Sequence, residues 1–271
     1  MNLSFVIGLV LAFVLVLFGI VFDTETSSLL FENLGNFEDP TSLLITVGGT
    51  IATIVASHPF SLLSKIPAHF GVIMRKQQDP LHYINIMTDL SQEARKKGLL
   101  ALEDSVSEFD DQFLKSSVML IVDAMEPDKV REQLESELSN IEGRHAQAAG
   151  MYDKGAAIAP GFGMIGTLIG LINMLAQMNF EDEGGASKLA KNMAVALITT
   201  FYGSLLANAM FIPMANQLRL AHEQEMLCKE IIIEGIISIQ AGENPRHIHE
   251  KLLSYLTQKQ REKAGDGESG E

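Results

Sequence analysis

Three threonines and two prolines in the apolar second half of this 271-residue chain have the chemistry to handle a cation. They are Pro160, Thr167, Thr199, Thr200 and Pro213. A hard cation that loses part of its hydration shell needs oxygen ligands, and threonine hydroxyls supply them. Each proline lacks an N–H group, so the carbonyls of Ala156 and Ala209 lose their helical partners and become further oxygen donors.

Helical spacing places these residues on definite faces. Thr167 follows Pro160 by seven residues and shares its face, while Thr200, Gly203 and Ala207 form a stripe of small residues on another helix. A less specific interpretation stays open. In it, the threonines bond carbonyls four residues earlier in their own helices, and the prolines only kink those helices.

The string GFGMIG at residues 161–166 has the spelling of a dinucleotide-binding turn. That fingerprint has meaning only between a strand and a helix, where backbone N–H groups face the pyrophosphate. Residues 155–180 contain no charged side chain and are long enough to cross a bilayer as one helix. We therefore reject the nucleotide interpretation and expect the glycines to permit close helix packing in lipid. The residues expected in this packing are Gly163, Gly166, Gly170 and Gly203.

Four stretches of the chain are free of charge. The chain is 47% hydrophobic but carries 34 acidic and 20 basic residues, so apolar and charged residues must be segregated. The stretches are residues 1–22, 40–64, 155–180 and 192–218, and the proline in SHPF (57–60) limits the second to about 41–57. They predict four transmembrane helices. The first lacks the basic region and cleavage site of a signal peptide, so we expect it to be retained.

The basic residues predict the orientation. Residues 23–39 contain five acidic and no basic side chains, whereas residues 58–154 contain eleven Lys or Arg and the segment after residue 218 contains seven. By the positive-inside rule both termini and the middle segment are expected to lie in the cytoplasm, in a multi-pass membrane protein. Membrane lipid is therefore an expected partner. A net charge of −14 argues against nucleic acid as a partner.

The remaining segments have helical patterns. Asp79 and Pro80 predict the start of a helix over 79–98, and Asn244 and Pro245 predict another start. The pattern over 130–147 predicts a helix that continues into the third span. The predicted fold is an all-α membrane protein with four transmembrane helices and a helical cytoplasmic domain between spans 2 and 3. The expected segments are 1–57 (spans 1 and 2), 58–150 (cytoplasmic domain), 151–218 (spans 3 and 4), 219–258 (cytoplasmic helices) and 259–271 (disordered tail).

The four spans lack any ionisable side chain at depth. A pump or transporter that works alone normally places such a residue there, so we expect that this protein does not supply its own proton-carrying group. No nucleophile–base pair or ligand set for an intramembrane enzyme is present, so we expect no catalytic site and no cofactor. Cys228 is a single cysteine, and His247 and His249 point to different sides of a helix, so no permanently bound metal is expected.

Several stretches resemble one known family. They are EARKKGLLALED (93–104), IEGRHAQ (141–147), APGFGMIGTLIGLINML (159–175), MAVALITTFYGSLLANAMFIPMANQL (193–218) and IIIEGIISIQAGENPRHIHEKLLSYL (231–256). In order and spacing the chain is similar to the A-subunits of flagellar motor stators, the MotA/PomA family. The resemblance implies five A-subunits around two single-span, peptidoglycan-binding B-subunits that bring an aspartate. It also implies that the A-subunit ring turns as ions pass and pushes the rotor switch protein.

Site residues are carried over from the family at matching positions. In the family, a basic and an acidic residue eight apart contact the rotor, and they match Arg95 and Glu103, with Lys96 and Asp104 as neighbours. The alternative is an ordinary solvated charged face.

The family also bears on which ion is carried. Threonine in GMIGT and in LITT resembles the sodium-type members, so the transported cation is expected to be sodium. Ala157 departs from this pattern, because some sodium-type members have an acidic or polar residue there.

Two other functions stay open. An energising subunit of an envelope transport complex, resembling ExbB or TolQ, belongs to the same class, but such proteins usually have three spans and lack the long middle domain. A scaffold without ion flux is the other, and the polar stripe on the third and fourth spans argues against it.

Overall fold

The protein is described by a computed structural model that covers residues 3–23, 27–75, 78–107, 109–177 and 185–261. Helices make up nearly all of it, which confirms the all-α prediction. The strands in these ranges form a two-residue ladder, in which β1 (Phe22–Asp23) pairs with the antiparallel β2 (Ser28–Leu29), and turns and short irregular segments make up the rest. Residues 262–271, most of the tail that we expected to be disordered, lie outside the described residues.

Four helical segments are long and apolar enough to cross a membrane, which confirms the predicted spans. The first is α1 (Leu3–Val21), and the third lies within the 50-residue α9 (Pro127–Ala176). The second consists of α2 (Pro40–Leu43), the π-helical η2 (Leu44–Gly48) and α3 (Gly49–Ser57). The fourth consists of α10 (Gly185–Leu205), the π-helical η4 (Leu206–Phe211) and the start of α11 (Ile212–Gln240).

The chain divides into two compact units. Unit 1 comprises Met1–Arg75 and Ala146–Arg219, and unit 2 comprises Lys76–His145 and Leu220–Glu271. Helices α9 and α11 each contribute residues to both units. The short helices α4 (Phe60–Leu63) and α5 (Ile66–Met74) belong to unit 1, whereas the sequence grouped residues 58–75 with the cytoplasmic domain.

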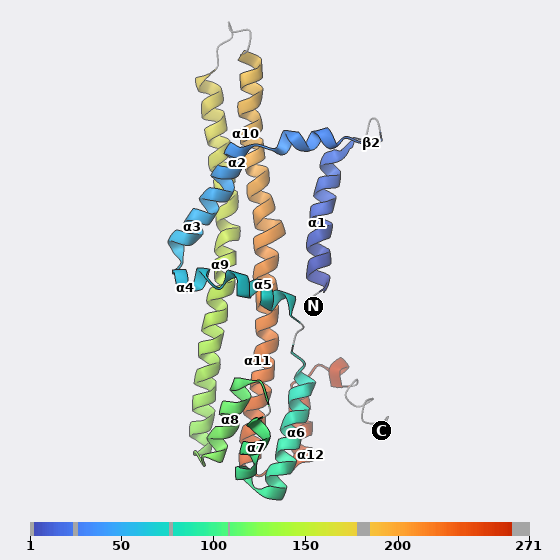
Figure 1. Cartoon of the computed structure of the whole chain (residues 1–271), viewed down its shortest axis with the longest axis vertical. Helices are drawn as coiled ribbons and strands as arrows, with labels where there is room; N and C mark the ends of the chain where they lie inside the picture. The colour runs from blue at the N-terminus through green and yellow to red at the C-terminus, as the bar shows by residue number, and fades with distance from the viewer. Residues whose placement is uncertain (1–2, 24–26, 76–77, 108, 178–184, 262–271) are drawn as a thin grey trace. The chain divides into compact units, whose positions relative to one another are not determined.

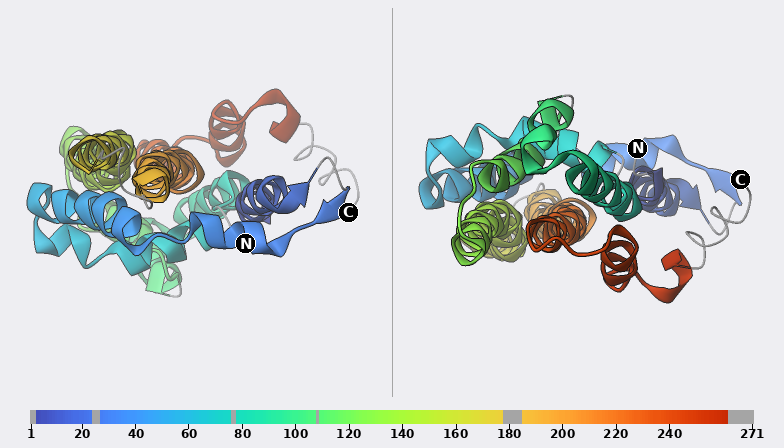
Figure 2. Two further views of the ribbon diagram at one scale, coloured as in Figure 1. Left: turned by 90° about the horizontal axis from the view of Figure 1, so that it is seen from above. Right: turned by 90° about the horizontal axis from the view of Figure 1, so that it is seen from below.

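Unit 1 is built around the pair of helices α9 and α10. Figures 1 and 2 show the two lying side by side, with α2 and α3 next to them. Helix α1 stands further out and connects to α2 through the 3₁₀-helical η1 (Phe31–Phe37), and most of its apolar side chains are exposed. Such exposure fits a helix surface that meets lipid rather than protein.

Local side-chain and backbone chemistry explains where the helix of the second span begins and ends. The Asp39 carboxylate caps its start by accepting from the Ser42 N–H at 2.7 Å, and Pro40 occupies the first helical position. The helix ends at Ser57, where His58 turns extended ahead of Pro59, as predicted from the SHPF string.

Unit 2 packs α6 (Pro80–Lys97), η3 (Leu99–Ala101), α7 (Leu102–Ser107), α8 (Gln112–Val122) and α12 (Pro245–Leu253) with the parts of α9 and α11 that belong to it. Isoleucines of α11 form one wall of its core. They are Ile231, Ile232, Ile236 and Ile239, all at most 4% exposed. Burying one such side chain contributes about 1.5–3 kcal/mol.

The predicted caps of unit 2 are present. The Asp79 carboxylate accepts from the Leu81 N–H at 3.1 Å, and the Asn244 side chain accepts from the Arg246 N–H at 3.1 Å. Gly98 ends α6 with a φ of 89°, a left-handed conformation that glycine adopts without strain. These signals confirm the helix starts expected at residues 79–80 and 244–245.

Candidate functional site

Two of the three threonines meet at one point of unit 1. The hydroxyl oxygens of Thr167 on α9 and Thr200 on α10 lie 2.6 Å apart, and both lie near the Ala196 carbonyl, at 3.0 and 3.3 Å. Thr200 is exposed and Thr167 half-buried, so the pair lies at the surface of this helix pair. We call these two residues the hydroxyl pair. Each oxygen has a lone pair beyond those used in the mutual bond, which a cation can accept.

Thr199 has different surroundings. Its side chain is fully buried, and its hydroxyl donates to the Ala196 carbonyl at 3.0 Å. A Cβ atom on Gly166 would lie only 2.4 Å from the Thr199 methyl carbon. Thr199 therefore fills the contact between α9 and α10, on a side of α10 other than that of Thr200.

The hydroxyls also bond their own helices. The Thr167 hydroxyl lies 3.1 Å from the Gly163 carbonyl and the Thr200 hydroxyl 3.3 Å from the Ala196 carbonyl, each four residues earlier, as alternative acceptors for the single proton of each hydroxyl. These contacts agree with the less specific interpretation of the sequence, in which each threonine bonds a carbonyl of its own helix. It does not account for the contact between the two hydroxyls, which joins different helices.

Glycines permit the close approach of α9 and α10. A Cβ atom on Gly163 would lie 3.0 Å from the Thr199 carbonyl oxygen, and one on Gly170 would lie 2.7 Å from the Asn192 carbonyl oxygen. A Cβ atom on Gly203 would lie 2.6 Å from the carbonyl oxygen of Ala159, on the facing helix. Larger residues would force the backbones apart.

The two prolines lie near irregular or crowded backbone. Pro160 is inside α9, next to the fully buried Ala159 that faces Gly203. Pro213 lies near the start of α11, just after the π-helical η4. A proline removes one helical N–H, and a π turn is one way in which a helix adjusts to that loss. The irregular backbone of the fourth span therefore lies one turn before Pro213.

A row of buried hydroxyls on the second span was not predicted. Ser42, Thr46 and Thr50 follow one another at intervals of four residues and are at most 1% exposed. The Thr46 hydroxyl donates to the Thr199 carbonyl at 3.3 Å, and the Ser42 hydroxyl approaches the Val195 carbonyl at 3.4 Å. The four-residue spacing is visible in the sequence and would have revealed this face.

An ion pair links α9 and α11 within unit 1. The Arg219 guanidinium donates to the Asp153 carboxylate and, at 3.2 Å, to the Asn216 side-chain oxygen. Asp153 and Arg219 flank the charge-free parts of the third and fourth spans. Charges at these ends fit the boundary of a membrane-spanning segment.

The residues expected at the rotor interface are all exposed in unit 2. Arg95 and Lys96 lie in the last turn of α6, and Glu103 and Asp104 in the first turn of α7. The intervening turn presents Leu100, which is 74% exposed. Two basic side chains, an apolar one and two acidic ones therefore follow each other along this turn, an arrangement that complements a partner of mixed charge.

Glu93 joins α6 to α7 beneath that surface. It accepts from the Ser105 hydroxyl at 2.5 Å and from Lys97 at 2.9 Å, and these two bonds, the first above all, lower the pKa of its carboxyl. A cavity of about 500 Å³ lies beside it, with Ile86, Leu90 and Phe109 among its apolar walls. The sequence did not single out this contact, because the partners are twelve residues apart on separate helices.

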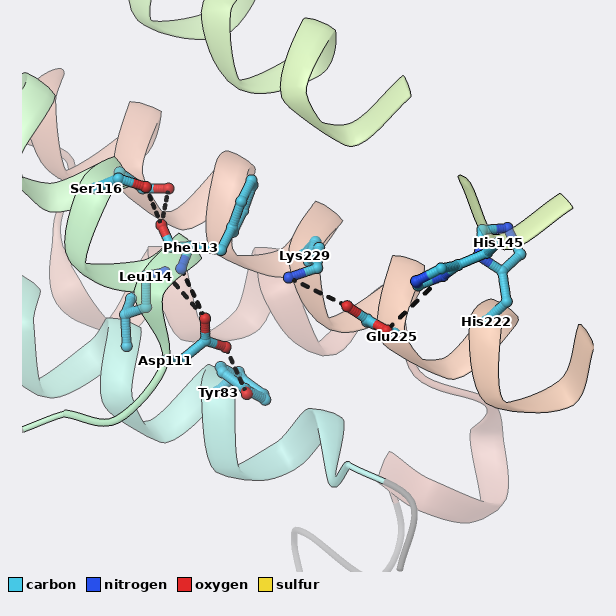
Figure 3. Close-up of polar contacts among 10 residues, drawn as sticks. Tyr83, Asp111, Phe113, Leu114, Ser116, His145, His222, Glu225 and Lys229 are labelled. Carbon is cyan, nitrogen blue, oxygen red and sulfur yellow. Dashed lines mark hydrogen bonds and ion pairs between the residues drawn. The ribbon is translucent and has the colours of Figure 1, made fainter. Parts of the chain in front are cut away.

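Figure 3 shows a second polar network of unit 2, between α9, α11 and α8. The Nδ1 atoms of His145 and His222 lie 3.1 Å apart, and Glu225 lies 3.9 Å from His145 Nδ1. Glu225 also pairs with the buried Lys229 at 3.4 Å, and the Lys229 ammonium lies 4.5 Å from the Phe113 ring centroid. The carboxylate and the ring compensate this buried cation.

The same figure shows how α6 is fixed to α8. Asp111 caps α8 by accepting from the N–H groups of Phe113 and Leu114, at 2.9 and 3.3 Å, and accepts from the Tyr83 hydroxyl at 2.9 Å. Burial and the neighbouring Asp111 raise the pKa of the Tyr83 hydroxyl, which stays a donor.

These features define a helical membrane protein with a hydroxyl-lined helix pair and a separate charged unit. A model of the MotA/TolQ/ExbB proton channel family matches residues 105–231. The chain is 39% identical to Motility protein A of Borreliella burgdorferi over the whole of both chains. It is 35% identical to the chemotaxis protein PomA of Vibrio alginolyticus, over 96% of this chain and 98% of that one.

A solved structure has the same fold. The flagellar MotAB stator complex from Bacillus subtilis matches with a TM-score of 0.83 and 32% identity, over 95% of this chain and 97% of that one. The chain belongs to the MotA/TolQ/ExbB family, and the predicted resemblance to stator A-subunits is confirmed.

Proposed function

We propose that this chain is the A-subunit of a flagellar motor stator that conducts sodium and turns its passage into torque on the rotor. Its full-length similarity to Motility protein A and to the chain in the MotAB stator complex supports the assignment. Five copies surround two single-span B-subunits, as the family resemblance implies. An ExbB- or TolQ-like energising subunit is the alternative, and four spans with a long helical segment between the second and third favour the stator.

The hydroxyl pair is the observation that carries the choice of ion. The described spans present hydroxyls and carbonyls but no carboxylate, so the B-subunit aspartate supplies the charge. Thr167 and Thr200 offer two oxygens 2.6 Å apart to a dehydrated cation, which a proton on the aspartate would not need. The matched family is one of proton channels, whereas the hydroxyls of this chain favour sodium. Thr199 packs between the helices in this proposal and does not bind the ion.

The orientation follows from the charges, with both termini and unit 2 in the cytoplasm. A cysteine at Ser28 should react with an impermeant reagent added to intact cells, and one at Ser254 should react only after lysis. The reverse pattern would refute the orientation.

Measurements of motor speed test which ion drives the motor. In cells whose only stator is this subunit with its B-subunit, speed should rise with external sodium at fixed pH and survive a protonophore. Thr200→Ala should raise the half-saturating sodium concentration. Full speed in sodium-free buffer, abolished by the protonophore, would show that protons drive the motor.

A further inference from the structure

Thr46 makes a hydrogen bond between the second and the fourth spans. It lies at the centre of η2, is fully buried, and donates to the Thr199 carbonyl of α10 at 3.3 Å. Thr50 and Thr53 instead donate within their own helix, to the carbonyls of Thr46 and Gly49 at 2.6 and 2.9 Å.

Ser42, one turn earlier, has a closer partner than α10. Its hydroxyl lies 2.5 Å from the Asp39 carboxylate and 3.4 Å from the Val195 carbonyl, so its single proton goes to the carboxylate. Of these two hydroxyls, that of Thr46 is therefore the better placed to donate to the backbone of the fourth span.

The accepting carbonyl lies directly before Thr200. It is enclosed on a second side by α9, because a Cβ atom on Gly163 would come within 3.0 Å of it. The Thr199 backbone is thus held between the Thr46 hydroxyl and α9. A shift of this peptide unit moves Thr200, whose hydroxyl must stay 2.6 Å from that of Thr167 to complete the hydroxyl pair.

The π turn around Thr46 fits a functional role. Single π turns within α-helices occur frequently at functional sites, where they redirect a side chain. Interhelical hydrogen bonds in membranes are of modest strength. Loss of this one should alter the position of Thr200 without preventing assembly.

We propose that Thr46 is a positioning residue for the ion pathway, and that it fixes the hydroxyl pair by holding the Thr199 carbonyl. Thr46 itself does not contact the ion. The role of the pair as ion ligands rests on the proposed function, whereas the positioning of Thr200 by Thr46 does not.

The first test measures motor speed against external sodium in Thr46→Val, Thr46→Ser and Thr53→Val. Thr46→Val should raise the half-saturating sodium concentration roughly threefold to tenfold, as expected for one interhelical hydrogen bond. The maximum speed should be nearly unchanged. Thr46→Ser, which keeps the hydroxyl, should restore the wild-type value, and Thr53→Val is the matched control. Equal half-saturation in Thr46→Val and Thr53→Val would overturn the proposal for ion binding.

The second test does not depend on the ion. Cysteines replace Thr167 and Thr200 in the assembled stator, and disulfide formation under mild oxidation is measured by alkylation and mass spectrometry. Thr46→Val should slow cross-linking, whereas Thr46→Ser and Thr53→Val should not. An unchanged rate in Thr46→Val would overturn the positioning role. Sodium-independent wild-type speed together with slowed cross-linking would instead reject sodium and keep the positioning role.

Discussion

Thr199 and Thr200 are adjacent in the chain, yet one is fully buried and the other exposed. Neighbouring residues of a helix point about 100° apart, so one of the two had to face away from the hydroxyl pair. The sequence pattern alone did not decide which. Gly166 determines that Thr199 is the buried one, because the absence of a side chain at Gly166 leaves the space that Thr199 fills. A residue that matches a family motif can therefore lie buried in a contact between two helices.

Gly203 offers a test of that packing. Gly203→Ala would place a Cβ atom 2.6 Å from the Ala159 carbonyl oxygen, a backbone atom that cannot rotate away. We expect a loss of about 1–3 kcal/mol in stability and a lower melting temperature of the purified protein. Gly161→Ala is the control, because no atom lies within 4 Å of the added Cβ. Equal stability of the two variants would contradict the close contact.

The exposed charges at the α6–α7 turn give a second prediction at the residue scale. Arg95→Glu and Glu103→Lys should each reduce swimming speed while membrane insertion and assembly stay normal. Exposed charge pairs contribute only about 0–1 kcal/mol, so neutral substitutions should have small effects and reversals larger ones. Lys129→Glu, another exposed reversal in unit 2, is the control. Normal motility of the double reversal would show that these charges form an ordinary solvated face.

At the scale of elements, helix starts and the glycines of the close helix contact were predictable, whereas the polar contacts between helices were not. Asp79 with Pro80 and Asn244 with Pro245 carry local signals, because a cap acts on N–H groups two or three residues away. The Thr46 bond to Thr199 spans 153 residues and depends on how two helices pack. The continuous run of α9 from Pro127 was predictable as well, since its apolar spacing does not break before the third span.

Helices α9 and α11 carry a pH-sensitive contact in unit 2. Burial lowers the pKa of the His145 imidazole, with His222, Arg144 and Lys229 acting in the same direction and Glu225 opposing them. The folded-state pKa therefore lies below the ordinary value of 6.5. Above that value neither state binds the proton. Below it the unfolded state binds it first, so stability falls as pH falls.

Hydrogen exchange of the intact protein measures this effect. Peptides of α9 and α11 around His145 and His222 should exchange faster at pH 5.5 than at pH 7.5, after correction for intrinsic rates. His145→Gln should weaken this pH dependence, and His247→Gln, at an exposed site, should retain it. A pH dependence that His145→Gln leaves unchanged would assign it to other groups.

At the scale of the whole molecule, the proposed ion pathway lacks a charge carrier of its own. Hydroxyls, carbonyls and close-packed glycines line the contact of the third and fourth spans, and none of the four spans has an ionisable side chain at depth. Intramembrane ion pathways normally contain such a group. We therefore expect a second kind of subunit to supply the charge, and similarity to the MotAB complex supports this expectation.

The entry of sodium or protons into liposomes tests whether the second subunit is required. The purified A-subunit alone should give no sodium or proton entry above that of empty liposomes, because the cation meets only neutral oxygens in the spans. Co-reconstitution with the B-subunit should produce flux, and replacing the B-subunit aspartate by asparagine should abolish it again while the complex still forms. The asparagine variant keeps size and hydrogen bonding and removes only the charge. Robust flux through the A-subunit alone would mean that its own oxygens suffice for permeation and that the carboxylate is not the missing component.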